Sequence, residues 1–233
     1  MIEVVVETTS TNANLAARLR AAEAIAEGQW LIADRQTAGR GRQGREWFDG
    51  AGNFMGSTVV HLGFGDPQPG SLALLAGLAL HEVISAHLPA QHRAMLKWPN
   101  DVMIDAAKLA GILLEREGDA VVIGIGVNLA SAPQLPDRAT VALADLATAP
   151  PRDQFAEQLA AQFAVELARW RAYGLASVIV RWLAVAHPLG TRLSTEELAG
   201  SFAGLTDEGQ LQLRLGDGSL AVVNAGEVRL EQD

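Results

Sequence analysis

Two apolar segments joined by a short turn impose a β-sheet on the middle of the chain. Lys108–Glu117 and Ala120–Asn128 flank Gly118-Asp119, a dipeptide typical of a tight hairpin turn. Their aliphatic interiors indicate strands in the centre of a sheet. Gly124 and Gly126 interrupt the second segment. Because glycine weakens a strand, we expect another group to approach the backbone closely at these two positions.

A glycine- and arginine-rich segment, Gly39–Trp47, follows an apolar run at 30–33 that we expect to be a strand. Its three glycines allow positive φ and a close approach of backbone N–H groups to a ligand. Its arginines offer forked donors suited to phosphate or carboxylate. Residues 34–47 hold four arginines against Asp34 and Glu46, a local charge of +2 in a chain of net charge −9. This glycine–arginine loop therefore predicts a site for a small anion.

Two other interpretations of the glycine–arginine loop compete with an anion site. Its glycines match the dinucleotide-binding fingerprint, but that fingerprint requires a helix immediately afterwards. Residues 48–53 have turn composition instead, so we reject the fingerprint. A solvated Arg-Gly loop of the RNA-binding kind stays open on composition alone.

Lysine is scarce in this sequence. Of the 18 basic residues, only Lys97 and Lys108 are lysine, and the others are arginine. A general preference for arginine, set for example by genomic base composition, makes the two exceptions informative. Unless they survived by chance, they mark sites where a compact ammonium group cannot be replaced by a planar guanidinium.

The remaining pattern alternates strands and helices, then changes near the C-terminus. We expect strands at 4–6, 52–60, 95–98 and 102–104, and helices at 13–27, 72–87, 150–173 and 175–185. Ser10, Thr11 and Ser71 precede helices and are expected to cap them, and the first two are also placed to hold a polar ligand. Pro99-Asn100-Asp101 is a turn tripeptide. From Gly190 onward, short strands and tight turns indicate a small β-barrel-like module.

Composition and missing motifs exclude several classes of protein. The chain is 49% hydrophobic and 19% charged, far from a disordered composition, and has neither a transmembrane run nor a signal-peptide start. The absence of cysteine excludes disulfides and thiolate metal sites and fits the cytoplasm. The net charge of −9 argues against a nucleic-acid or membrane surface.

The motifs of P-loop nucleotidases, serine hydrolases and zinc proteases are also missing. The polar residues that remain suit electrostatic catalysis on an anion without a covalent enzyme intermediate.

Five motifs in a fixed order resemble those of the bacterial biotin–protein ligases. They are Ser10-Thr11-Asn12, Gln36 with the glycine–arginine loop, Lys97-Trp98-Pro99-Asn100-Asp101, Lys108-Leu109-Ala110-Gly111-Ile112 and Gly124-Ile125-Gly126-Val127-Asn128. The resemblance covers essentially the whole chain, and both lysines fall inside the motifs. It implies an α+β fold with a class II aminoacyl-tRNA synthetase-like mixed sheet and helices over residues 1–186, and an SH3-like C-terminal β-barrel over 187–233.

The resemblance also implies a two-step reaction that uses ATP, biotin and Mg²⁺. Biotin's carboxylate would attack the α-phosphate of ATP to give biotinyl-5′-AMP and pyrophosphate. A lysine of a biotin carboxyl carrier protein, from acetyl-CoA carboxylase or a related enzyme, would then take the biotinyl group. Neither nucleic acid nor membrane is expected as a partner. The metal ligands and the oligomeric state stay open, with a homodimer among the states considered.

The resemblance assigns catalytic roles to Lys108, Arg40 and Arg42, with Lys108 bridging the biotin carboxylate and the phosphate. The implied binding residues are Ser10, Thr11, Asn12, Gln36, Gly39, Arg40, Gly41, Arg42, Trp47, Lys97, Asn100, Asp101, Lys108, Gly111 and Asn128. The hydroxyls and Gln36 would hold the ureido ring, and the loop would order over the adenylate. Trp47 and Asn128 would lie at the adenine, and the Lys97–Asp101 motif would serve the phosphates or metal.

Three departures from the family pattern set further expectations. The chain begins at the catalytic domain without a winged helix, so a repressor role on DNA is not expected. Gln43 stands where many relatives have arginine, so retention of the intermediate is expected to be looser. Asn53–Ser57 differs from the more aromatic family pattern and receives no site residue. The alternatives kept are a lipoate- or octanoate-type acyl ligase or transferase and a non-catalytic biotin- or nucleic-acid-binding module.

Overall fold

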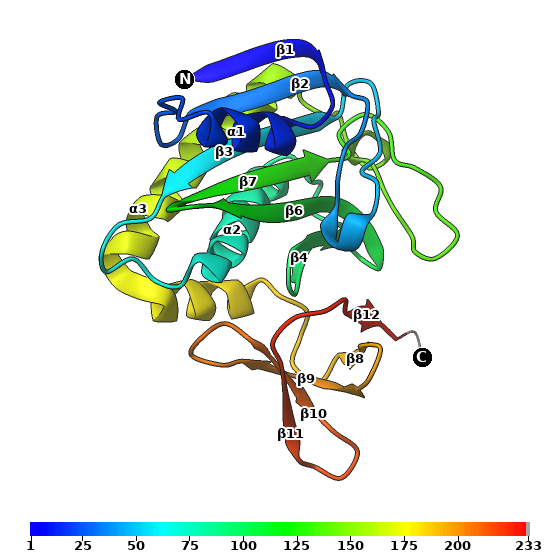
Figure 1. Ribbon diagram of the computed structural model, residues 1–233. Coiled ribbons are helices and arrows are strands. Elements are labelled where there is room, and N and C mark those ends of the chain that lie inside the picture. The colour runs from blue at the N-terminus through cyan, green and yellow to red at the C-terminus, as the bar shows by residue number, and fades with distance from the viewer. Residues whose placement is uncertain (232–233) are drawn as a thin grey trace.

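The computed structural model describes residues 1–231, and its largest element is a seven-stranded mixed sheet. The strands are β1 (Ile2–Thr8), β2 (Trp30–Gln36), β3 (Phe54–His61), β4 (Ala94–Lys97), β5 (Asp101–Ile104), β6 (Ala107–Glu117) and β7 (Ala120–Val127). They lie in the order β1-β2-β3-β7-β6-β5-β4 (Figure 1). Strands β1 and β2 are parallel and the other neighbours are antiparallel. The predicted mixed sheet, with the β6–β7 hairpin inside it, is confirmed.

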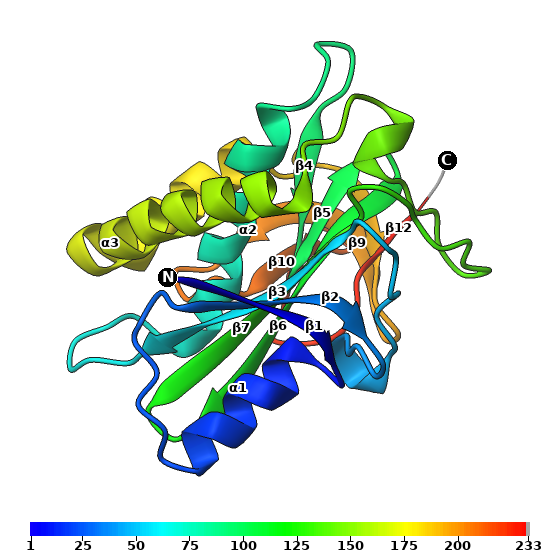
Figure 2. The ribbon, with the colours of Figure 1, turned by 90° about the horizontal axis from the view of Figure 1, so that it is seen from above.

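Helices cover the two faces of this sheet unequally (Figure 2). On one face lie α2 (Leu72–Ser85) and α3 (Arg152–Ala184), and their apolar side chains form the main core with strand residues such as Ile123 and Ile125. On the other face lies α1 (Thr11–Arg20), over a small cluster that includes Val59 and Val122. The single short helix leaves the rest of that face uncovered by helices. Short 3₁₀ turns occur at η1 (Arg42–Gly44), η2 (Pro69–Ser71) and η3 (Leu143–Asp145).

Helix α1 is shorter than predicted, because it ends at Arg20 and not at residue 27. Ala22 takes a positive φ of 58°, which turns the chain out of the helix. The turn brings Ile25 into the small cluster beneath α1, where it is 4% exposed. Burial of this one aliphatic side chain therefore outweighs the helix propensity of the segment.

Two other expectations about helix ends have different outcomes. The predicted break in α3 is confirmed, because Gly174 has a φ of +71° and separates two helical segments. Across this bend, Arg181 Nη1 lies 2.5 Å from a carboxylate oxygen of the buried Glu166. Ser71 stands at the predicted N-cap position of α2, but its side chain does not cap the helix. Its hydroxyl instead donates to the carbonyl of Gln68 and accepts from the Trp170 indole at 2.8 Å.

The C-terminal residues form a second, five-stranded antiparallel sheet, as the fold prediction required. Its strands are β8 (Arg192–Ser194), β9 (Ala199–Leu205), β10 (Leu211–Arg214), β11 (Leu220–Val223) and β12 (Arg229–Leu230), in the order β11-β10-β9-β8-β12. Phe202 and Leu213 belong to the same apolar core as α2 and α3. The Trp98 indole also donates to the carbonyl of Gly209 at 3.0 Å. The division at residues 186 and 187 stays a prediction.

None of the helices in residues 1–231 is long and apolar enough to cross a membrane.

Candidate active site

A cavity of about 950 Å³ lies against the sheet face that α1 leaves uncovered. Its lining includes every residue predicted for the site, from five separate stretches of sequence. They are Ser10, Thr11, Asn12, Gln36, Gly39, Arg40, Gly41, Arg42, Trp47, Lys97, Asn100, Asp101, Lys108, Gly111 and Asn128. The fold thus brings the five motifs to one place, and the volume is typical of a small-molecule site.

Glycines on β6 and β7 make room for side chains that line this cavity. In the sheet register Gly111 lies opposite Gly126. A Cβ added at Gly126 would lie 2.2 Å from the Trp47 ring, and one at Gly124 would lie 2.3 Å from Asn12 Oδ1. The expected close approach at both positions is confirmed, because neither could hold a side chain without displacing its neighbour.

The glycine–arginine loop bends back on itself beside these strands. The N–H of Gly41 donates to the carbonyl of Arg45 at 2.7 Å, and the N–H of Trp47 donates to that of Gly39 at 3.0 Å. Among the loop glycines only Gly44 has a positive φ, of 73°, so that expectation was wrong for the other two. Gly39 is required for space instead, because a Cβ there would lie 2.9 Å from the carbonyl of Trp47.

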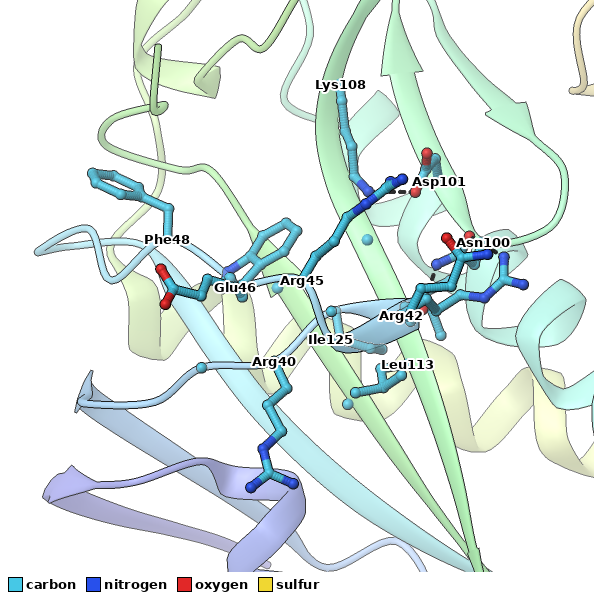
Figure 3. A pocket seen from close by; sticks show the side chains of 18 of the residues that line it. Arg40, Arg42, Arg45, Glu46, Phe48, Asn100, Asp101, Lys108, Leu113 and Ile125 are labelled. Atoms are coloured by element: carbon cyan, nitrogen blue, oxygen red, sulfur yellow. Dashed lines mark hydrogen bonds and ion pairs between the residues drawn. The ribbon is translucent and has the colours of Figure 1, made fainter. Parts of the chain in front are cut away.

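A lysine–aspartate cluster (Lys97, Asp101, Lys108) lines the cavity, and Figure 3 shows Asp101 beside Lys108. Asp101 Oδ1 lies 2.5 Å from Lys108 Nζ, and its Oδ2 lies 3.2 Å from Lys97 Nζ. Burial by itself would raise the pKa of Asp101, but the two ammonium groups outweigh burial and hold the pKa below its usual range. Lys97 also donates to the carbonyl of Val228 at 2.9 Å. Both lysines are therefore fixed in place before any ligand binds.

The turn between β4 and β5 connects this cluster to the loop. Asn100 Nδ2 donates to the carbonyl of Ile112 at 2.6 Å, which fixes the orientation of the amide. Its Oδ1 accepts from Arg42 Nη1 at 3.2 Å. Figure 3 shows Arg42 beside Asn100, whereas Arg40 extends away from Lys108. Of the two arginines predicted as catalytic, only Arg42 contacts the turn that holds the lysine–aspartate cluster.

Hydroxyl and amide groups form the opposite end of the cavity, at the start of α1. Ser10 accepts from the N–H of Ala13 at 3.5 Å, so the predicted N-cap is present with a long hydrogen bond. The N–H of Thr11 donates to Gln36 Oε1 at 2.7 Å. Ser57 Oγ, fully buried on β3, lies 2.7 Å from Thr11 Oγ1 and 2.6 Å from Asn12 Oδ1. Sequence reasoning missed Ser57, although a hydroxyl inside an apolar strand was a signal available to it.

Trp47 and Asn128 line the cavity, and each has a buried polar atom. The indole Nε1 of Trp47 and Oδ1 of Asn128 have no hydrogen-bond partner among the residues that the structure describes. Lys108 Nζ lies 5.7 Å from the Trp47 ring centroid, within reach of a cation–π contact. Because buried polar atoms are normally paired, both atoms are candidates for contacts with a ligand.

Glu227 of the C-terminal module and Arg138, which follows β7, line the cavity although no sequence motif indicated them. The guanidinium of Arg45 forms a two-pronged ion pair with Glu227, and Arg138 Nη1 lies 3.4 Å from the same carboxylate. This ion pairing, chiefly with Arg45, holds the pKa of Glu227 below its ordinary value. Both arginines and Glu227 line the cavity. Nothing in the local sequence pairs residues so far apart, which explains why they were not predicted.

The fixed cations of this cavity suit an enzyme that acts on anionic substrates. The model of the biotin/lipoate A/B protein ligase family matches residues 3–128, and that of the biotin protein ligase C terminal domain matches residues 191–230. The chain belongs to the biotin/lipoate A/B protein ligase family and, within it, to the biotin protein ligases.

Its similarity to individual members extends over nearly the whole chain. It is 39% identical to the biotin–[acetyl-CoA-carboxylase] ligase of Paracoccus denitrificans, over 95% of this chain and 97% of the relative. It is 35% identical to the enzyme of that name from Mycobacterium tuberculosis, over 97% and 88%. The biotin protein ligase from Aquifex aeolicus, solved in complex with biotin and ATP, has the same fold, with a TM-score of 0.84, 23% identity and 99% coverage of both chains.

Proposed function

We propose that this enzyme activates biotin with ATP and transfers it to a protein lysine. In the first step the carboxylate of biotin attacks the α-phosphate of ATP, which forms biotinyl-5′-AMP and releases pyrophosphate. In the second step the amine of one lysine on a biotin carboxyl carrier domain attacks the acyl carbon of the mixed anhydride and releases AMP. The amine loses a proton in this step, and an amide bond replaces the anhydride bond.

The observation that carries this proposal is the lysine–aspartate cluster. Joining a carboxylate to a polyphosphate brings negative charges together, so cations must be in position beforehand. Lys108 and Lys97 line the cavity as ammonium groups held at 2.5 Å and 3.2 Å from one buried carboxylate. Asp101 neutralises part of their charge and restricts their movement. The compact ammonium group of Lys108 can bridge the biotin carboxylate and the α-phosphate, where the negative charges meet.

The remaining lining residues divide between the two ends of the substrate pair. Gln36, Thr11 and Ser10 are assigned to the ureido ring, because hydroxyl and amide groups meet there. Trp47 and Asn128 are assigned to the adenine, because each presents an unpaired buried polar atom. The glycine–arginine loop, including Arg40 and Arg42, would cover the intermediate and keep water from the anhydride.

Mg²⁺ enters the proposal with the nucleotide and not as a resident metal. Five acids line the cavity. Asp49, Asp101, Asp137 and Glu227 each pair with lysine or arginine, Glu46 is exposed, and no group of three or more metal-ligating acids or histidines occurs in residues 1–231. The residues therefore do not fit a resident ion. Magnesium commonly binds through substrate phosphates and water, and no step is assigned to a protein-bound metal.

Partner, assembly and location are parts of the proposal that need separate measurements. The carrier domain of acetyl-CoA carboxylase or a related enzyme is the proposed protein substrate. A catalytic unit at 1–186 and a C-terminal unit at 187–233, pairing of two copies and a cytoplasmic location stay predictions. Size-exclusion chromatography with light scattering tests the pairing, and cell fractionation tests the location.

Exchange of labelled pyrophosphate into ATP, measured with purified protein and Mg²⁺ but no carrier, tests the first step. Exchange that depends on biotin and does not occur with lipoate is the expected result. Exchange with lipoate alone would assign the enzyme to lipoate chemistry, and silence with either acid would overturn the proposal. Addition of a carrier domain should then give a biotinylated product detectable with streptavidin.

A further inference from the structure

A chain of hydrogen bonds leads from the cavity to the outer part of the sheet at the start of α1. It links five residues on four elements: Gln36, Thr11, Ser57, Asn12 and Glu115. The last link joins Asn12 Nδ2 to Glu115 Oε2 at 2.8 Å. We refer to these residues as the Glu115–Gln36 chain. Ser57 and Glu115 do not line the cavity, so they act on a ligand only through the other three.

The chemistry of its groups fixes the direction of each hydrogen bond in the chain. The carboxylate of Glu115 only accepts, so the amide nitrogen of Asn12 must face it. The amide oxygen of Asn12 then faces Ser57, 2.6 Å away, and also only accepts. The single hydroxyl hydrogen of Ser57 is therefore directed to Asn12.

The hydrogen bonds of the residues that line the cavity have fixed directions as well. With its hydrogen committed, Ser57 Oγ accepts across the 2.7 Å contact with Thr11, so the Thr11 hydroxyl donates to it and not across the longer 3.2 Å contact with Gln36 Oε1. The backbone N–H of Thr11 requires an acceptor, which assigns the oxygen of the Gln36 amide to that contact at 2.7 Å. The Gln36 nitrogen consequently lies on the side of Gly39, 3.2 Å from where a Cβ of that glycine would be.

We propose that Ser57 and Glu115 are positioning residues for ligand recognition. They set the hydrogens so that this end of the cavity offers an amide N–H donor from Gln36 and an oxygen lone pair from Thr11. A ring that carries a carbonyl acceptor beside an N–H donor complements this pair. The inference rests on the proposed function, in which that ring is the ureido ring of biotin.

The sheet around the chain is arranged to admit it. Ser57, Gly124 and Leu113 lie opposite one another in register on β3, β7 and β6. Asn12 crosses this row, where its oxygen would be 2.3 Å from a Cβ at Gly124. Within residues 1–231 the Glu115 carboxylate forms no ion pair, and its hydrogen-bond partner is the Asn12 amide. A charge at this place thus serves to orient an amide.

A purely structural role for the buried Ser57 predicts a different result from a positioning role. If Ser57 only satisfies a buried hydroxyl, Ser57→Ala lowers stability and leaves substrate affinity unchanged. If it positions Thr11 and Asn12, we expect Ser57→Ala to raise the KM for biotin about tenfold, the effect of one hydrogen bond. The KM for ATP and the kcat of pyrophosphate exchange should then stay within about twofold of wild type.

Variants of Glu115 test the hydrogen bond between Asn12 and Glu115. We expect these variants to fold, because the Glu115 side chain is only half-buried. Glu115→Gln keeps an oxygen acceptor for Asn12 and should leave the biotin KM near wild type. Glu115→Ala should raise it, and Ser57→Ala/Glu115→Ala should raise it by less than the product of the single effects. Two matched control variants, Glu117→Ala and Thr58→Val, should leave the biotin KM unchanged. In the wild type the Glu117 carboxylate lies 3.7 Å from Arg20, and the Thr58 hydroxyl donates to the carbonyl of Gln29.

The measurement is pyrophosphate exchange at varied biotin and varied ATP, beside urea unfolding of each variant. A biotin KM unchanged in both Ser57→Ala and Glu115→Ala, with an active wild-type enzyme, would overturn the inference. A rise in the two control variants of equal size would also overturn it, because general loosening would then be the cause. A wild-type enzyme that does not exchange with biotin would overturn the proposed function and this inference together.

Discussion

The lysine–aspartate cluster and the glycine–arginine loop lie in the same cavity but are built in opposite ways. The cluster sits on strands β4, β5 and β6, its aspartate is 8% exposed, and its charges pair with one another. The loop is mostly exposed and is held by its own backbone, one contact to Asn100 and ion pairs from Arg45. The difference indicates that the lysine–aspartate cluster is a preformed set of charges, whereas the glycine–arginine loop can change conformation over a ligand. One rigid element could not both fix charges and close over a ligand.

The largest effect on activity should come from the lysine–aspartate cluster. We expect Lys108→Ala to fold normally and to lower biotin-dependent pyrophosphate exchange by about 10³-fold, typical of losing a preorganised charge. Circular dichroism provides the control for folding. Lys108→Arg keeps the charge but not the compact ammonium group, and it should also be severely impaired. Turnover equal to wild type in the alanine variant would remove Lys108 from the mechanism.

Removing the carboxylate between the lysines should affect stability more than any change in the loop. Asp101→Asn leaves two ammonium groups side by side and should cost about 3 kcal/mol at pH 7. The pKa of Asp101 is lower in the folded chain than its unfolded value of about 3.9. The contribution of Asp101 to the free energy of unfolding is therefore complete at a pH above its unfolded pKa, and it is lost as the pH falls through the folded pKa.

Urea unfolding at several pH values measures this effect. The difference between wild type and Asp101→Asn should be full at pH 7 and shrink below about pH 4. The matched variant Asp49→Asn, at an exposed pair with Arg35, should change stability by less than about 1 kcal/mol. A difference that stays constant down to pH 2 would contradict the assigned ion pairs.

A change in the glycine–arginine loop should have a moderate effect, on retention of the intermediate. We expect Arg40→Gly to keep the first step and to release about tenfold more free biotinyl-AMP, because a looser loop admits water and lets the intermediate leave. Chromatography of the supernatant after a single turnover measures the release. Retention like that of wild type would show that the loop does not close over the intermediate through Arg40.

The smallest effect is expected where the C-terminal module contacts the loop. Glu227→Gln removes a partly exposed ion pair with Arg45, so a loss of about 1 kcal/mol or less is expected. Limited proteolysis should detect faster cleavage of the loop at low salt, and high salt should reduce the difference between variant and wild type. A loss of stability as large as that of Asp101→Asn would mean that the glycine–arginine loop is as rigid as the lysine–aspartate cluster.

Much of the fold could be predicted because its signals are local. The β6–β7 hairpin follows from aliphatic runs around a turn dipeptide, and the break at Gly174 follows from one glycine inside a helical pattern. The end of α1 could not be predicted, because it depends on burying Ile25 against a distant sheet face. Packing of this kind is a property of the tertiary structure.

The site divides in the same way. Residues inside compact motifs, such as Lys108 and Gln36, could be selected from sequence, and the cavity brings them together. Glu227 was missed because its partner Arg45 is distant along the chain. Ser57 was missed because its segment departs from the family pattern, although a hydroxyl inside an apolar strand was a signal. The expectation of positive φ at Gly39 was wrong because glycine serves close approach as well as unusual torsion angles.

The core that α2 and α3 share with the C-terminal sheet has a consequence for cooperativity. If the chain were cut before β8, Phe202 and Leu213 would be separated from the apolar residues of α2 and α3. Those helix residues would lose apolar neighbours in turn. Heating should therefore melt the enzyme in one endotherm whose calorimetric and van't Hoff enthalpies agree. A substitution that loosens the packing of either sheet should then lower the melting temperature of both.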